Sequence, residues 1–135
     1  MKHTILVVDD SEDIALISAR MLTQRGFAVI TACDGQEALD IVSRQRPNCI
    51  LLDVMMPRMS GLEVLQTLKA DAATAGIPVI MVTAKTTDDD VLHGYQQGAD
   101  YYITKPFTAD ELVYGVSLVL GDHPAATSSP ARSMT

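Results

Sequence analysis

Five side chains able to do chemistry follow short apolar runs of the chain. The adjacent Asp9 and Asp10 come directly after ILVV, Asp53 after CILL and Thr83 after PVIMV, while Lys105 closes the segment that starts with YYI. If these runs are parallel strands, their carboxyl ends share one edge of the sheet, which is where open sheets bind ligands. We therefore expect three acids, a hydroxyl and an amine to converge there.

The residue types in this group predict a site for a cation and a phosphate. Three carboxylates placed close together repel one another and raise each other's pKa unless a cation lies among them. An all-oxygen cluster suits Mg²⁺, which usually takes one or two carboxylates together with waters and a phosphate. Lys105 is a compact positive donor suited to a phosphate oxygen, and Thr83 can donate one further hydrogen bond. Asp9 and Asp10 are most simply interpreted as holding Mg²⁺.

Each of these residues also has an ordinary structural interpretation. An aspartate after a strand is commonly the N-cap of the next helix, and this applies to Asp10 taken alone. Thr83 could cap a helix in the same way, and Lys105 could be a surface residue in the turn before Pro106. Correct placement after four separate strands favours the functional interpretation of the group.

The pattern between these residues predicts the elements that position them. Several of the apolar runs are apolar at every position, which is typical of strands covered on both faces. Amphipathic stretches separate the runs. Strands alternating with helices predict an α/β fold with a parallel sheet and helices on both faces. The expected strands are 5–8, 28–30, 49–52, 78–82 and 101–103.

Helix starts and one helix face can also be predicted. The pairs Ser60–Glu63 and Thr108–Glu111 fit capping boxes, and Asp34–Glu37 is a weaker version. The aspartates of 86–90 would stand at the start of another helix, where negative charge is favourable. In the first helix the apolar spacing predicts a buried stripe, and Gly26 would end that helix. The stripe consists of Ile14, Ile17 and Met21.

Length and composition limit the possible classes of protein. The chain has 135 residues with a formal net charge of −7, so we expect one domain and no direct contact with nucleic acid. There is no signal peptide pattern and no apolar stretch long enough to cross a membrane, which predicts a soluble cytoplasmic protein. Cys33 and Cys49 lack metal-ligand spacing and are expected to be buried, reduced thiols. We expect a domain over 1–120 and a disordered tail or linker stub over 121–135.

The motifs together resemble those of a known family, the receiver domains of two-component response regulators. The resemblance covers roughly residues 4 to 120 and rests on VVDD, LLDVMMPRMSG (51–61), VTAK (82–85) and GADYYITKPF (98–107). It implies a doubly wound, flavodoxin-like sheet of five parallel strands in the order 2-1-3-4-5. It also implies a switch that a histidine kinase or a histidine phosphotransfer protein phosphorylates.

The resemblance assigns the acids to specific roles. Asp53 matches the aspartate that accepts the phosphoryl group, and it also supplies a carboxylate to Mg²⁺. Asp10 matches the direct metal ligand, Asp9 the ligand that acts largely through water, and the backbone carbonyl of Met55 completes the protein's share. The side chains of Met55 and Lys85 match variable positions that tune how long the phosphate lasts.

The resemblance also assigns a switch mechanism. Lys105 matches the lysine that pairs with the phosphate, and its bond to Pro106 is expected to be cis. Thr83 matches the switch hydroxyl and Tyr102 the switch aromatic, which implies an output surface on the fourth helix, fifth strand and fifth helix. Tyr114 stands where regulators that dimerise through this surface often have a basic residue. This difference argues against a DNA-binding type of dimer and favours another, unknown protein target.

Two alternatives belong to other functional classes. A Mg²⁺-dependent phosphatase with an aspartyl nucleophile would use similar groups, but such enzymes typically place nucleophile and general acid two residues apart on one strand. Here the adjacent acids follow the first strand and the candidate acceptor follows the third. The other alternative, a phosphate-independent interaction module, is disfavoured because every residue of the site is present. We therefore expect a phosphoacceptor switch rather than a classical enzyme.

Overall fold

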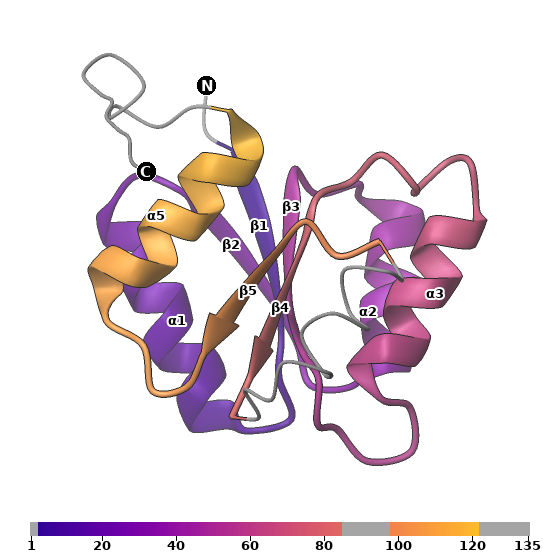
Figure 1. Cartoon of the computed structure of the whole chain (residues 1–135), viewed down its shortest axis with the longest axis horizontal. Coiled ribbons are helices and arrows are strands. Elements are labelled where there is room, and N and C mark those ends of the chain that lie inside the picture. The colour runs from indigo at the N-terminus through magenta and orange to yellow at the C-terminus, as the bar shows by residue number, and fades with distance from the viewer. Residues whose placement is uncertain (1–2, 85–97, 122–135) are drawn as a thin grey trace.

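In the part of the chain that the structure describes, a five-stranded parallel sheet has helices on both faces (Figure 1). The computed structural model describes residues 3–84 and 98–121. The strand order is β2-β1-β3-β4-β5, as predicted. Helices α1 and α5 cover one face, and α2 and α3 cover the other. The elements are β1 Thr4–Val8, α1 Glu12–Gln24, β2 Ala28–Ala32, α2 Gly35–Arg44, β3 Cys49–Asp53, α3 Gly61–Ala70, β4 Val79–Thr83, β5 Tyr101–Thr104 and α5 Ala109–Leu120.

Burial explains why these segments are strands. Every residue of β3 and β4 is buried, since helices cover both faces of the sheet. Two apolar cores result, one on each side of the sheet. The predicted strands are confirmed, but several end later than predicted: β3 includes Asp53 and β4 includes Thr83. Asp53 and Thr83 are therefore the last residues of paired strands.

The predicted helix starts are confirmed where the structure describes them. Ser60 with Glu63, and Thr108 with Glu111, form complete capping boxes at α3 and α5. Asp34 caps α2 by accepting from the Glu37 N–H at 2.7 Å. The Glu37 carboxylate instead accepts from the Cys33 N–H, so this box is incomplete. The predicted helix start at 86–90 and the tail at 122–135 lie outside the described residues.

The predicted stripe of α1 is only partly buried, and it is wrong at Ile17. Ala15, Ser18 and Leu22 are the buried residues, whereas Ile17 is 46% exposed. Ile14 and Met21 are only partly buried. Helix α1 packs against both β2 and α5, and this packing buries a face made of two small side chains and Leu22. The predicted stop is confirmed, because Gly26 has a φ of +95° just after the helix.

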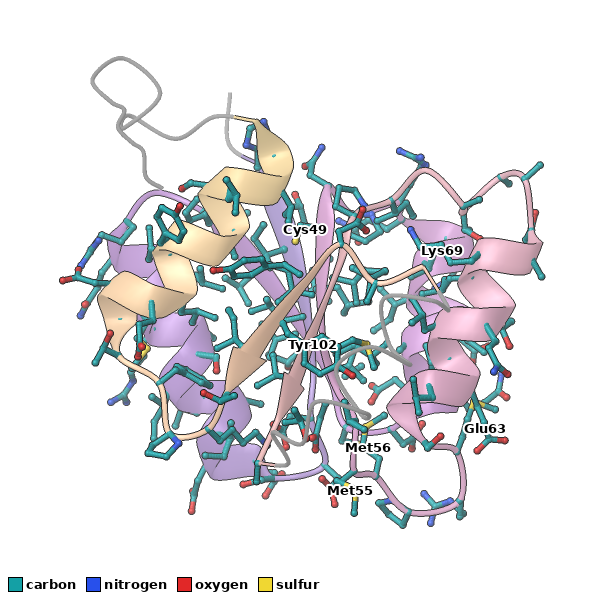
Figure 2. The ribbon with its side chains drawn as sticks, in the orientation of Figure 1. Cys49, Met55, Met56, Glu63, Lys69 and Tyr102 are labelled. Atoms are coloured by element: carbon teal, nitrogen blue, oxygen red, sulfur yellow. The ribbon has the colours of Figure 1, made fainter. Side chains whose placement is uncertain are left out.

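The two cysteines differ in their environments, and the prediction for Cys33 is wrong. Cys33 is exposed, because it lies just beyond Ala32, the buried last residue of β2. Cys49 is buried as predicted, and burial raises the pKa of its thiol to about 12. Figure 2 places Cys49 at the end of the sheet opposite Met55, so its protonated thiol lies away from the predicted site.

Among the described residues, no helix combines the length and the apolar character needed to cross a membrane.

Candidate functional site: an acidic cluster with one lysine

The three predicted acids meet at the carboxyl edge of the sheet. One carboxylate oxygen from each of Asp9, Asp10 and Asp53 lies within 4.8 Å of the other two. Asp9 and Asp53 are each 4% exposed, whereas Asp10 faces solvent. Strands β1 and β3 are neighbours, with Val8 paired to Leu52, so the residues that follow these two come together. The cluster offers oxygen ligands alone, the donor set that a hard divalent cation prefers.

Asp9 is held by two donors. Its Oδ1 accepts from the Ser11 N–H at 2.9 Å, and its Oδ2 accepts from the Lys105 ammonium at 2.9 Å. The N-cap of α1 is Ser11, whose hydroxyl accepts from the Ile14 N–H. The alternative interpretation of Asp10 as this N-cap is therefore wrong, and Asp10 remains available for other partners.

Asp53 is a buried acid whose charge is only partly balanced. It ends β3 opposite Val82, and its Oδ1 accepts from the Met55 N–H at 3.2 Å. The Lys105 ammonium lies 3.5 Å from the same oxygen. Burial raises the pKa of Asp53 to about 6, and the negative charge of Asp9 adds to this effect, while Lys105 and the Met55 N–H act against it. A cation beside Asp53 would lower this pKa.

Lys105 reaches the acids from the fifth strand. Its N–H donates to the Thr83 carbonyl at 2.9 Å, which extends the pairing of β4 with β5, and its peptide bond to Pro106 is cis, as expected. Burial alone would lower the pKa of the ammonium, but the hydrogen bond to Asp9 and the charge of Asp53 outweigh this, so the pKa is raised. The ammonium therefore stays charged between two carboxylates.

Thr83 and Tyr102 lie on neighbouring strands. Thr83 is buried and follows Val82, the residue paired with Asp53. Tyr102 pairs with Met81 and packs, partly buried, against the core on the α2–α3 side, as Figure 2 shows. Their switch roles stay predictions. Lys85 lies outside the described residues.

The loop between β3 and α3 surrounds the acceptor and contains features that the sequence did not reveal. Figure 2 shows Met55 and Met56 at the edge of the sheet to which the strands point, and Met55 is 54% exposed while Met56 is buried. Arg58 has a left-handed backbone with a φ of +66° and pairs with Asp34 at 3.7 Å. Arginine is not a typical left-handed residue, so no local signal predicted this turn.

Comparison with known proteins agrees with this geometry. Residues 5–117 match the family described as the response regulator receiver domain. The chain is a receiver domain. The family acts in two-component signal transduction, so the resemblance found in the sequence is confirmed.

Two curated relatives show where receiver domains of this type occur. The DNA-binding response regulator MtrA of Mycobacterium tuberculosis is 42% identical over 134 residues, 97% of this chain and 58% of MtrA. The phosphate regulon transcriptional regulatory protein PhoB of Pseudomonas aeruginosa is 43% identical over 117 residues, 87% of this chain and 51% of PhoB. This receiver domain therefore spans little more than half the length of these relatives.

Solved structures confirm the fold. The chemotaxis protein CheY4 of Vibrio cholerae superposes with a TM-score of 0.84 at 31% identity, covering 88% of this chain and 99% of CheY4. A putative response regulator from Chloroflexus aurantiacus gives a TM-score of 0.86 at 31% identity, covering 90% and 99% of the two chains.

Proposed function

We propose that this receiver domain accepts a phosphoryl group on Asp53 from a phosphohistidine of a kinase or phosphotransfer protein. The observation that carries the proposal is the grouping of Asp53 with two further carboxylates and the Lys105 ammonium. The bond from an Asp53 oxygen to phosphorus forms as the bond from phosphorus to the donor nitrogen breaks. The imidazole leaves with the bonding electron pair.

The acids fit a Mg²⁺ ion. Asp9, Asp10 and Asp53 offer oxygens within 4.8 Å of one another, and burial together with the charge of Asp9 raises the pKa of Asp53. Both facts favour a cation at this place. We assign these three carboxylates and the backbone carbonyl of Met55 as its protein ligands. When bound, Mg²⁺ neutralises charge on the transferring phosphoryl oxygens.

Two further groups of the chain support the transfer. Lys105 places a second positive charge beside Asp53, where it can pair with a phosphoryl oxygen in place of the Asp53 carboxylate. The Met55 N–H orients Asp53 by donating to its Oδ1. Phosphorylation replaces the single negative charge of Asp53 by a phosphoryl group of about −1.5 to −2, so the site becomes more negative by up to about one charge and gains three oxygen acceptors, enough to shift its hydrogen-bond partners.

We infer that the switch reaches the surface through Thr83 and Tyr102. Thr83 would donate to a phosphoryl oxygen, and the space it leaves would admit the ring of Tyr102. A hollow of about 340 Å³ lies on the surface of β5 and α5 and is suited to a protein target. Its lining residues are Tyr101, Tyr102, Ile103, Thr104, Asp110, Glu111 and Tyr114. With a net charge of −7 we propose no direct contact of this domain with DNA, although MtrA is named as DNA-binding.

Incubation with acetyl phosphate and Mg²⁺, followed by intact mass measurement, tests the acceptor. We expect one phosphate that base and hydroxylamine remove on the wild type and none on Asp53→Asn. Asp40→Asn, an exposed acid on α2, is the matched control and should be labelled like the wild type. Labelling that persists in Asp53→Asn would place the acceptor elsewhere.

Lys105→Ala tests the switch separately. The three carboxylates remain in this variant, so Mg²⁺ should still bind. Backbone NMR shifts of β5 and α5 should change on phosphorylation in the wild type but not in the variant. A normal response in Lys105→Ala would remove this lysine from the mechanism.

A further inference from the structure

Gly35, the first residue of α2, lies against the β3–α3 loop, and a side chain here would require Val64 or Met59 to shift. A Cβ atom at this position would lie 2.7 Å from Val64 Cγ2 and 2.9 Å from Met59 Sδ. Both distances are well inside carbon van der Waals contact, which begins near about 3.5 Å. Gly35 is buried and helical, so its backbone does not require glycine and alanine would be the better helix former. The glycine is explained by the close approach of Met59 and Val64.

A second contact joins the same two segments. Asp34, the N-cap of α2, pairs with Arg58 at 3.7 Å, next to the contact of Gly35 with Met59. The loop is turned tightly here, because the Met59 N–H donates to the Pro57 carbonyl at 2.7 Å and Arg58 is left-handed. Two consecutive loop residues thus rest on two consecutive residues at the start of α2.

The other side of this loop holds the acceptor. The Gly61 N–H donates to the Val54 carbonyl at 3.0 Å, and a Cβ at Gly61 would overlap the Asp53 carbonyl. The Met55 N–H donates to Asp53 Oδ1. These contacts close the base of the loop on residues 53–55, so the short loop is the covalent connection through which a shift of Met59 would reach Met55.

We propose that Gly35 is a positioning residue for the cation site. Because Gly35 has no side chain, Met59 can pack against the start of α2. This packing fixes the position of Met55, so that its N–H donates to Asp53 and its carbonyl can bind the cation. The inference rests on the proposed function for the identity of the cation as Mg²⁺. It adds α2, which contributes no ligand, to the elements that determine cation affinity.

The test is Gly35→Ala, with two readouts. Isothermal titration with MgCl₂ should show affinity reduced by about tenfold, at the lower end of the range for residues that orient metal ligands. In metal-free protein, the NMR shift of the Met55 amide should move, because its hydrogen bond to Asp53 changes. Gly76→Ala is the matched control, since a Cβ there meets only Arg46 Nη2 at 3.6 Å and both readouts should stay at wild-type values.

Two double variants separate positioning from general destabilisation and also serve if Gly35→Ala folds poorly. Gly35→Ala with Met59→Ala removes the clash with the loop, and Mg²⁺ affinity should recover. Gly35→Ala with Val64→Ala removes the clash with α3, and affinity should stay low. Recovery in the Val64 double variant alone would overturn the route through the loop. Wild-type Mg²⁺ affinity and an unmoved Met55 amide in Gly35→Ala, with only a lower unfolding midpoint, would overturn the proposal.

The proposed function can fail independently. If the wild type binds no Mg²⁺ or Asp53 takes no phosphate, the function proposed above is wrong. The Met55 amide in metal-free protein would still show whether Gly35 positions the loop.

Discussion

Asp53→Asn should stabilise the protein in the absence of divalent cations. The Asp53 side chain is 5% exposed, and burial raises its pKa from 3.8 to about 6. Because one pKa unit corresponds to about 1.4 kcal/mol, ionised Asp53 lowers the free energy of unfolding by about 3 kcal/mol. Asparagine keeps the size of the side chain without its charge. We expect a gain of about 2–3 kcal/mol for Asp53→Asn at pH 7.5.

The sign of the pH dependence follows from the same shift. Between pH 3.8 and about 6 the folded protein keeps the Asp53 proton while the unfolded chain loses it. The destabilisation is therefore absent below about pH 4, grows through this window and is complete above about pH 6. The advantage of Asp53→Asn over the wild type should shrink steadily as the pH is lowered from 7 to 4.

Urea unfolding followed by far-UV circular dichroism measures this effect, since the chain has no tryptophan. Measurements in EDTA at several pH values give the metal-free difference, and Asp40→Asn should stay within about 0.5 kcal/mol of the wild type. MgCl₂ should then stabilise the wild type, by about 2.7 kcal/mol at a hundredfold excess over Kd, and have little effect on Asp53→Asn. A metal-free Asp53→Asn no more stable than the wild type at pH 7.5 would refute the electrostatic account of the cluster.

Three further substitutions test the packing around the site, each by urea unfolding. Gly61→Ala should lower the free energy of unfolding by about 2–4 kcal/mol, because the new Cβ overlaps the Asp53 carbonyl; a loss below 1 kcal/mol on this same scale would mean that the loop yields easily. Arg58→Gly should raise it by about 0.5–1 kcal/mol, since glycine adopts a φ of +66° without strain and the exposed pair with Asp34 contributes little; a loss would contradict this. Ser18→Ala should be neutral or stabilising by up to about 1 kcal/mol, because the buried hydroxyl has no hydrogen-bond partner among the described residues, and a clear loss would imply a bound water.

Local patterns were sufficient to predict the strands and the starts of α2, α3 and α5. The continuous apolar runs that became β3 and β4 are buried on both faces, and few other structures accommodate such runs in a chain of this length. The capping boxes at Ser60 and Thr108 depend on residues three apart, so they are visible without any tertiary contact. The convergence of the acids followed from one rule about the edges of parallel sheets.

Long-range packing determined what these patterns left open. The buried face of α1 depends on how closely the helix approaches α5 and β2. Hydrophobicity alone predicted that Ile17 is buried, whereas the packing of the helix buries Ser18 instead. Cys33 lies between the end of β2 and the N-cap of α2, so its exposure depends on how this connection packs, which its residue type does not specify. Each of these outcomes depends on contacts between elements that are distant in the chain.

By itself the sequence determined which groups reach the site, because strand order and strand polarity bring the residues at the carboxyl ends of β1, β3, β4 and β5 to one edge. Only the tertiary structure decided how those groups meet: that Lys105 donates to Asp9, 96 residues away, and that burial raises the pKa of Asp53. The physical reason is that hydrogen bonds and desolvation depend on distances of a few ångströms, which residue spacing along the chain does not specify.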